Sequence, residues 1–290
     1  MSRITFIGLG AMGMPMAQCL VNSEHSVTGI DMSPAAVDTL IALGSEPTTS
    51  TADAIKTSDI VITMLPNGTI VRDVLFNDNK ALEALTSKKP IVIDMSSSAP
   101  LDTILLAKDL RSIDVSLLDA PVSGGVKRAN SGSLAIMVGG PSETVETVNE
   151  LLSIMGSSII HTGEVGSGHA MKAINNFVSA AGLVAASEAL LLGNKFGLES
   201  ETMLAVLNSS SGKNNATENK MSQFVLSEAF NSGFSLHLMK KDLGIAANLA
   251  DELNISSPML ASMKSLWSDA ADQVKPSTDH TEIYTFIKNK

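Results

Sequence analysis

A lysine and an asparagine, Lys172 and Asn176, follow two closely spaced glycines in residues 166–176 (GSGHAMKAINN). They are four positions apart, so in a helix their side chains lie on the same face and can reach one small ligand. A lysine amine beside a hydroxyl can act as a general base near neutral pH only if burial or nearby positive charge lowers its pKa. Because most lysines are solvated at the surface, the rest of the chain must indicate whether Lys172 does chemistry.

A glycine-rich turn near the N-terminus has the spacing of a dinucleotide-binding fingerprint. The apolar run at residues 3–7 is a predicted strand, and the GxGxxG motif follows it directly. The motif consists of Gly8, Leu9, Gly10, Ala11, Met12 and Gly13. In this pattern Gly8 permits a tight turn, Gly10 lets the backbone approach a pyrophosphate, and Gly13 allows close packing of helix on strand. A glycine-rich turn without a ligand would look the same, so the motif needs support.

An acidic residue at the end of the second predicted strand gives that support. Asp31 lies 23 positions after Gly8 (31 minus 8), close to the about 20 expected for a residue that binds the adenosine ribose. Its charge repels a 2′-phosphate, and no arginine follows it in DMSPAA, so NAD is favoured, with NADP still possible. Asp31 could instead cap the helix that begins near Pro34, although Ser33 can supply that cap.

The first half of the chain alternates strand and helix patterns, which predicts a mainly parallel, doubly wound α/β sheet of Rossmann type. Predicted strands lie at 3–7, 26–30, 60–64, 91–94, 115–118, 134–138 and 158–161, and predicted helices at 35–43, 51–57, 70–75, 81–85 and 143–152. Leu65, Pro66 and Ser96 follow two of these strands, at the edge where such sheets bind ligands. They are candidate cofactor contacts, although a turn and a helix cap would need the same residue types.

A second glycine pair follows the strand at 115–118. Ser123, Gly124 and Gly125 place a hydroxyl beside adjacent backbone N–H groups, which suits a carboxylate. The strand pattern ends after residue 163, so we expect an NAD(P)-binding domain at 1–163 and an all-helical domain at 164–290.

The helical domain is predicted to begin with one long helix that bears Lys172 and continues to about residue 196. Further predicted helices lie at 200–207, 217–226, 236–253 and 258–274, with a short one from 281. Lys213, in a polar loop, and His280 could contact a long polar substrate, but we expect both to be exposed to solvent.

Composition restricts the classes of partner. The chain has 290 residues, a formal net charge of −10 and 44% hydrophobic residues, so nucleic acid and anionic membrane surfaces are disfavoured. A single cysteine, Cys19, cannot form an internal disulfide, and the five histidines have no metal-ligand spacing. The apolar runs are interrupted before the about 18 residues of a membrane span. We therefore expect a metal-free, cytoplasmic protein.

Four motifs in order resemble the β-hydroxyacid dehydrogenases, which include 3-hydroxyisobutyrate dehydrogenases and tartronate semialdehyde reductases. The motifs are GLGAMGMPM at 8–16, DAPVSGG at 119–125, GSGHAMKAINN at 166–176 and KDLGIAA at 241–247. The resemblance covers essentially the whole chain. It implies a Rossmann-type domain and an all-α C-terminal domain joined by a long interdomain helix, in a protein that commonly forms homo-dimers or homo-tetramers.

The resemblance also implies residue roles. Lys172 matches the catalytic acid/base of the family, and the remaining positions match residues that contact substrate or cofactor. The substrate positions are Ser123, Gly124, Gly125, Asn176, Phe234 and Asp242. The cofactor positions are the glycine motif, Asp31, Leu65, Pro66, Ser96 and Lys241.

The expected activity is NAD-preferring hydride transfer between a short 3-hydroxy acid and its semialdehyde, with 3-hydroxyisobutyrate as the default substrate. Tartronate semialdehyde or another polar semialdehyde is the alternative. A non-catalytic binding module on the same fold is disfavoured, because such relatives lack the lysine and carry basic regions.

Overall fold

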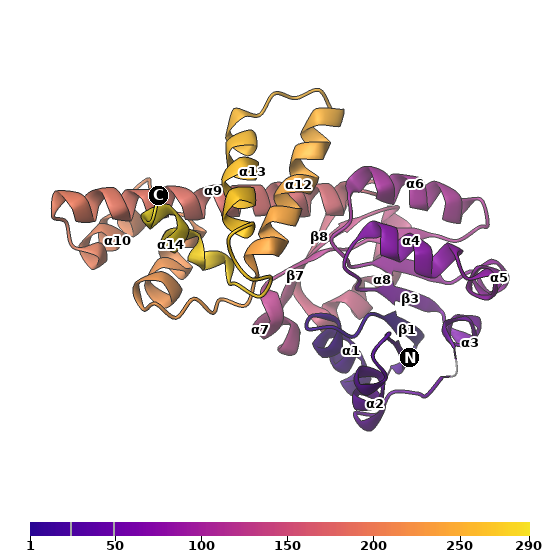
Figure 1. Ribbon diagram of the computed structural model, residues 1–290. Helices are drawn as coiled ribbons and strands as arrows, with labels where there is room; N and C mark the ends of the chain where they lie inside the picture. The colour runs from indigo at the N-terminus through magenta and orange to yellow at the C-terminus, as the bar shows by residue number, and fades with distance from the viewer. Residues whose placement is uncertain (24, 49) are drawn as a thin grey trace. The chain divides into compact units, whose positions relative to one another are not determined.

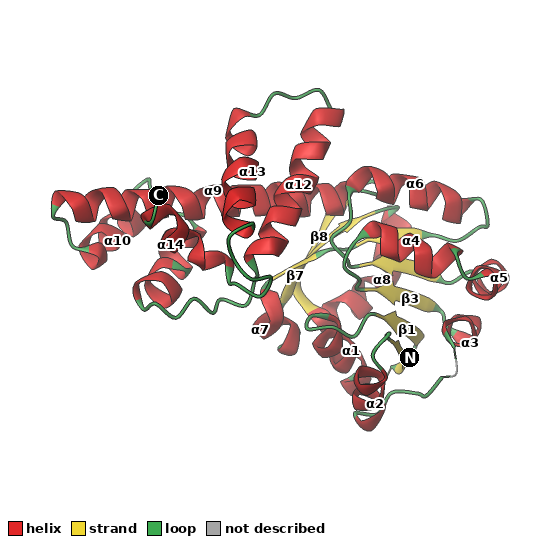
Figure 2. Cartoon of the chain, viewed as in Figure 1, coloured by secondary structure: helices red, strands yellow, loops and turns green. Residues whose placement is uncertain are grey.

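The computed structural model describes residues 1–23, 25–48 and 50–290, and the chain forms two compact units, Met1–Lys172 and Ala173–Lys290. Strands and helices alternate in the first unit until β8 ends at Gly163, and the second unit is helical (Figure 2). The division between the units falls inside α9, the helix Ser167–Phe196 (Figure 1).

The first unit is an α/β domain built on one eight-stranded sheet. Its strands are β1 (Arg3–Ile7), β2 (Ser26–Ile30), β3 (Ile60–Thr63), β4 (Ile91–Asp94), β5 (Leu117–Asp119), β6 (Val122–Ser123), β7 (Leu134–Gly139) and β8 (Gly156–Gly163). Its helices are α1 (Gly13–Asn22), α2 (Pro34–Ala42), α3 (Thr51–Thr57), α4 (Gly68–Phe76), α5 (Asn79–Lys88), α6 (Pro100–Arg111), α7 (Gly125–Asn130) and α8 (Ser142–Met155).

The sheet has the strand order β2-β1-β3-β4-β5-β7-β6, with β8 beside β7. The pairs from β2 through β5 are parallel. Strand β7 runs antiparallel to its neighbours β5 and β6 and parallel to β8. Consecutive strands β2 and β3 lie on opposite sides of β1, so the chain reverses its winding direction there. The carboxyl end of β1 is therefore the edge at which doubly wound sheets bind ligands, and the predicted fold class is confirmed.

Alternation along the strands creates a separate core on each face of the sheet. In β3, Ile60 and Ile62 pack with side chains of α1, α2 and α8, whereas Val61 packs with α3, α4, α5 and α6. Both faces are covered, which is why these strands are apolar on both sides.

Helix α6 was not among the predicted helices. Its apolar residues do not form a clean stripe, because Ile104 and Leu105 are exposed while Leu106 and Leu110 are buried. Pro100 at its start was the available signal. The helix bears on the site because it contributes Thr103 to a buried cluster described below.

The second unit packs its helices around buried Trp267. Its helices after α9 are α10 (Ser200–Ser209), α11 (Asn215–Asn219), a π-helix (Met221–Leu226), α12 (Leu236–Glu252), α13 (Pro258–Ala271), a 3₁₀-helix (His280–Glu282) and α14 (Ile283–Lys288). The predicted helix at 217–226 is thus two elements. The all-α character of this unit is confirmed.

Helix α9 is long and apolar enough to cross a membrane by length and composition, although no apolar run of that length was expected from the sequence. Within the protein, 44% of the residues in its most apolar window are buried. A core helix of a globular protein gives the same signal, so this property is weak evidence for a membrane span.

Candidate functional site

The glycine motif forms a tight turn between β1 and α1. Gly8 has φ +101°, and a Cβ there would collide with the carbonyl oxygen of Met64. A Cβ at Gly13 would collide with the Gly8 carbonyl oxygen, so helix and strand need glycine to approach. A Cβ at Gly10 would meet no described protein atom within 4 Å, which leaves open space over the turn.

Asp31 is held against this turn. One carboxylate oxygen accepts a hydrogen bond from Leu9 N at 2.7 Å, and the other accepts one from Ser33 N at 2.8 Å. Gly8 N also donates to Ile30 O at 2.8 Å, which brings the ends of β1 and β2 together. Ser33 occupies the N-cap position of α2, but its side chain makes no capping hydrogen bond. The carboxylate thus belongs structurally to the glycine turn as well as to the helix start.

The residues after β3 and β4 also meet. The hydroxyl oxygen of Ser96 accepts a hydrogen bond from Leu65 N at 2.9 Å, and Ser96 is buried while Leu65 is half-buried and Pro66 is exposed. While it accepts from Leu65 N, the Ser96 hydroxyl can still donate its own hydrogen to a ligand. Leu65 and Pro66 are the better exposed of the three.

The turn at Ser123–Gly125 has positive φ angles at both of its glycines. Gly124 has φ +138° and Gly125 has φ +68°, both in the left-handed region that favours glycine. The side chain of Arg128 packs over Gly124, so a Cβ there would lie 2.6 Å from Arg128 Cδ. A Cβ at Gly125 would meet no described atom within 4 Å, so a ligand has room to approach that part of the backbone.

Lys172 reaches the same turn. Its Nζ donates a hydrogen bond to Val122 O at 2.8 Å, immediately before Ser123, and the lysine is partly buried. Both the amine and the ammonium carry N–H groups. The Val122 carbonyl can therefore hold this nitrogen in either protonation state.

In the second unit, Asn176 and Asp242 form one buried pair. Asn176 Nδ2 donates to Asp242 Oδ2 at 2.6 Å, and Asp242 Oδ1 makes no hydrogen bond with any described residue. Lys241 Nζ lies 3.9 Å from Asp242 Oδ1. Buried carboxylate oxygens in a packed core nearly always accept a hydrogen bond. An oxygen that accepts none is therefore better explained as a position that receives a polar group of a ligand.

Phe234 is anchored by His280, and the expectation that His280 is exposed was wrong. His280 is 3% exposed. Its backbone N and its Nδ1 lie 2.8 and 3.0 Å from Phe234 O, and its ring meets the Phe234 ring edge-on. The sequence places His280 in a polar tail, STDHTEIY, whose burial only tertiary packing decides. Lys213 is exposed as expected, and it pairs with Glu218 at 2.8 Å.

A buried charged cluster surrounds His280. Lys220 Nζ lies 2.9 Å from His280 Nε2, and burial lowers the pKa of Lys220 to about 8. Burial also lowers the pKa of His280. Although burial opposes ionisation of Asp279, hydrogen bonds from His280 and Thr281 hold its pKa below the usual range. The ammonium of Lys220 can only donate, so His280 Nε2 accepts and Nδ1 carries the proton.

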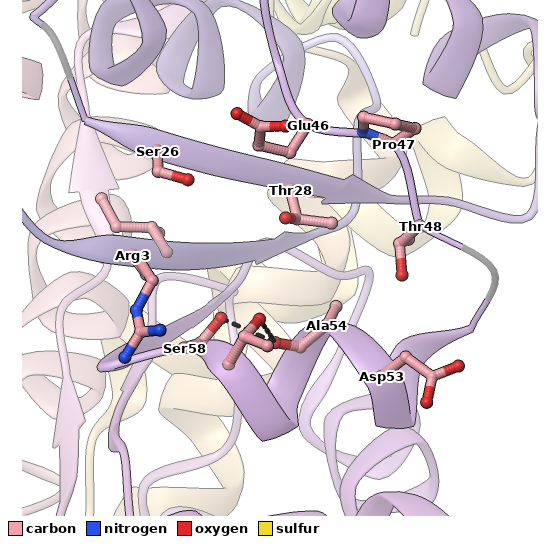
Figure 3. A pocket seen from close by; sticks show the side chains of 11 residues that line it. Arg3, Ser26, Thr28, Glu46, Pro47, Thr48, Asp53, Ala54 and Ser58 are labelled. Atoms are coloured by element: carbon pink, nitrogen blue, oxygen red, sulfur yellow. Dashed lines mark hydrogen bonds between the residues drawn. The ribbon is translucent and has the colours of Figure 1, made fainter.

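Two hollows lie elsewhere. One of about 330 Å³ is lined by Arg3, Ser26 and Thr28 on β1 and β2 and by Asp53 and Ala54 on α3 (Figure 3). Arg3 and Ser26 start their strands, so this hollow is at the opposite end of β1 from Gly8. The other, of about 310 Å³, lies where α12 meets α13. Neither is lined by any of the predicted site residues.

The described residues fit a dinucleotide and offer no metal centre. The turn with open space over Gly10, its attached carboxylate and the start of α1 are the parts that hold a pyrophosphate and a ribose. No group of three or more His, Cys, Asp and Glu side chains that could hold a metal ion occurs among the residues that the structure describes.

Comparisons with known proteins agree with this architecture. Residues 3–163 match the family described as the NAD binding domain of 6-phosphogluconate dehydrogenase. Residues 166–287 match the family described as NAD-binding of NADP-dependent 3-hydroxyisobutyrate dehydrogenase.

Individual relatives span nearly the whole chain. It is 39% identical to 2-(hydroxymethyl)glutarate dehydrogenase of Eubacterium barkeri over 89% of this chain and 86% of that protein. It is 37% identical to 3-sulfolactaldehyde reductase of Escherichia coli over 99% of this chain and 96% of that protein. The solved structure of Mycobacterium tuberculosis 3-hydroxyisobutyrate dehydrogenase with L-serine matches with a TM-score of 0.92, 31% identity and 99% coverage of both chains.

Proposed function

We propose that this protein interconverts a short 3-hydroxy acid and its semialdehyde, with Lys172 as acid/base. The reason is that the chain belongs to the β-hydroxyacid dehydrogenase family of NAD(P)-binding oxidoreductases. The observation that carries this proposal is the hydrogen bond from Lys172 Nζ to Val122 O, beside the Ser123–Gly125 turn. It keeps a proton-transfer group next to backbone suited to a carboxylate.

The residue roles follow from the chemistry. Ser123 and the N–H groups of Gly124 and Gly125 bind the substrate carboxylate. Lys172 Nζ takes the proton of the substrate hydroxyl in oxidation, and in reduction its ammonium donates a proton to the carbonyl oxygen. NAD, when bound, accepts the hydride from the hydroxyl-bearing carbon.

Residues of the second unit complete the assignment. Asn176 lies four positions after Lys172 on α9 and so shares its face. We assign Asn176, Phe234 and Asp242 to the substrate. The cofactor contacts are the glycine motif, Asp31, Leu65, Pro66, Ser96 and Lys241, with NAD preferred over NADP because of the Asp31 charge.

The default substrate is 3-hydroxyisobutyrate, the substrate in the name of several relatives. A second candidate is a substrate with another polar or acidic group, such as tartronate semialdehyde. Relatives of 39% and 37% identity, named for 2-(hydroxymethyl)glutarate and 3-sulfolactaldehyde, favour that second class.

We also propose that the domains divide functionally at residues 163 and 164, with the helical part forming a homo-dimer or homo-tetramer, and that the protein is cytoplasmic. Light scattering of the purified protein measures its oligomeric state. A monomer at all concentrations contradicts the assembly proposal.

The test is turnover of a substrate panel with NAD and with NADP, by wild-type protein and by Lys172→Ala. The panel contains 3-hydroxyisobutyrate, glycerate, threonate, 2-(hydroxymethyl)glutarate and L-serine. Loss of a positioned acid/base lowers kcat by about 10²–10⁴-fold, while the Kd for NAD stays near that of the wild type. Retained turnover in Lys172→Ala refutes the role of the lysine, and an inactive wild type across the panel refutes the activity.

A further inference from the structure

A fully buried histidine lies one turn before the lysine on α9. His169 is 1% exposed and precedes Lys172 by three residues. An imidazole this deeply buried is costly unless its ring nitrogens are hydrogen-bonded. The proposed reaction gives His169 no part.

The two ring nitrogens of His169 connect three elements. Nε2 lies 3.1 Å from Ser96 O, just after β4, and Nδ1 lies 2.8 Å from Thr103 Oγ1 on α6. A carbonyl oxygen can only accept, so Nε2 carries a proton and donates to Ser96. The ring thus ties the start of α9 to the end of β4 and to the first turns of α6.

The backbone of the same turn is held by Asp119. Its two carboxylate oxygens accept hydrogen bonds from Gly166 N at 2.7 Å and from His169 N at 2.8 Å. A Cβ at Gly168 would collide with Met137 O, so the helix start lies directly against β7. Asp119 and Gly168 fix the position of the turn, and the His169 ring fixes it against β4.

Ser96 continues the connection toward the proposed cofactor edge. Its hydroxyl accepts from Leu65 N, and its own N donates to Asp94 Oδ1 at 3.0 Å. Asp94 also accepts from Thr63 Oγ1 and Ser98 Oγ, both at 2.9 Å. Hydrogen bonds therefore run without interruption from Leu65 through Ser96 to the His169 ring.

We propose that His169 is a positioning residue, which holds Lys172 at a fixed place relative to Leu65 and Ser96 through the hydrogen bonds of its ring to Ser96 O and Thr103 Oγ1. Thr103 Oγ1 also lies within hydrogen-bond distance of Ala99 O, at 3.1 Å, which holds its hydroxyl on α6 beside Nδ1. The expected effect on kcat rests on the proposed function. The hydrogen bonds by which His169 holds the start of α9 do not depend on that function.

Two variants separate hydrogen bonding from filling of space. His169→Ala removes the ring, and His169→Gln restores an N–H donor for Ser96 and an oxygen acceptor for Thr103. Because a misplacement of about 1 Å can cost about 10²-fold in rate, we expect kcat to fall about 10–100-fold in His169→Ala. In His169→Gln it should recover to within about 5-fold of wild type, with substrate KM changed less than kcat in both variants.

Leu85→Ala is the matched control for lost packing. Leu85 is completely buried in the first unit, on α5, and takes no part in this network. At a temperature where all variants are folded by circular dichroism, this control should keep kcat within about 3-fold of wild type. A fall in kcat equal to that of His169→Ala overturns the positioning role.

Thr103→Val adds a test that does not depend on how glutamine fits. Combined with His169→Ala it forms a double-mutant cycle, and shared positioning predicts that the two effects on kcat are not additive. Thr103→Val should lower kcat several-fold in the wild-type background and hardly further in His169→Ala. Fully additive effects overturn the proposal.

Hydrogen exchange gives a readout without activity. The amides of residues 166–172 should exchange faster in His169→Ala than in wild type, and at the wild-type rate in Leu85→Ala. Unchanged exchange in His169→Ala overturns the tie. An inactive wild type would refute the proposed function instead, and the exchange result would still decide whether His169 holds the helix.

Discussion

At the level of single residues, charge and hydrogen bonding separate roles that the sequence leaves open. Asp31 could have been only a helix cap. Its contact with Leu9 N attaches the carboxylate to the glycine turn. His280, in contrast, lies in a polar stretch of sequence that suggests an exposed position. In the structure it is buried and contacts Phe234 O.

Replacing Asp31 tests the cofactor preference. Asp31→Asn keeps an oxygen that can accept from Leu9 N and removes the charge that repels a 2′-phosphate. We expect the ratio of kcat/KM for NAD to kcat/KM for NADP to fall about 10-fold. This change corresponds to about 1.4 kcal/mol. Steady-state kinetics with both cofactors measure the ratio.

Asp38→Asn is the control, because Asp38 is an exposed residue on α2 and its change alters the net charge equally. An identical fall in both variants would show that net charge, not the Asp31 contact, sets the preference.

Lys220 predicts a pH dependence of stability. Its pKa is lowered from 10.5 to about 8 by burial, so between these values the unfolded chain binds more protons and the free energy of unfolding rises with pH. The contribution is on the order of 3 kcal/mol over that interval, as an upper bound. Lys220→Met lacks the titrating ammonium. The free energy of unfolding of the variant minus that of the wild type should therefore decrease from pH 8 to pH 10.

Urea unfolding of both proteins at pH 8, 9 and 10 measures this difference and cancels the other titrating groups. Parallel pH dependences would mean that the Lys220 ammonium is not buried in solution.

At the level of elements, glycine positions decide how closely helices approach their neighbours. Gly168 and Gly244 both lie inside helices, but an added Cβ at Gly168 meets Met137 O, whereas one at Gly244 meets no described atom within 4 Å. The same substitution should therefore have opposite effects on stability at these two positions.

Gly168→Ala should lower the free energy of unfolding by about 1–3 kcal/mol, the usual cost of overpacking. Gly244→Ala should raise it by about 0.5–1 kcal/mol, since alanine loses less conformational entropy in a helix. Denaturant titrations of the two variants measure both changes. A stable Gly168→Ala protein would contradict the close contact between the start of α9 and β7.

At the level of the whole molecule, each of the two units has its own core. A ligand that binds only the folded state stabilises it, by about 2.7 kcal/mol at 100 times its Kd. NAD should therefore raise the unfolding temperature by several degrees, measured by differential scanning calorimetry.

Gly10→Val is the matched variant for that measurement. Its side chain would occupy the open space over the turn, so the unliganded protein should unfold near the wild-type temperature while the shift with NAD disappears. A shift of wild-type size in Gly10→Val would mean that NAD binds away from the glycine motif.

The sequence by itself determined the fold class, the glycine turn with its acidic partner, and the order of the four motifs. These features depend on local periodicity and on short spacings, which a chain carries within about 30 residues. Helix α6 was not predicted because its apolar residues do not form a stripe. The π-helix was not distinguished from an α-helix because the two have similar sequence patterns.

Only the tertiary structure decided which polar residues are buried together. His169, Ser96, Thr103 and Asp119 come from separate segments and meet because β4, β5, α6 and α9 pack side by side. Lys220, Asp279 and His280 meet in the same way. Burial and hydrogen-bond partners depend on contacts between distant segments, which no local pattern encodes, so the surroundings of Lys172 became visible only in the folded chain.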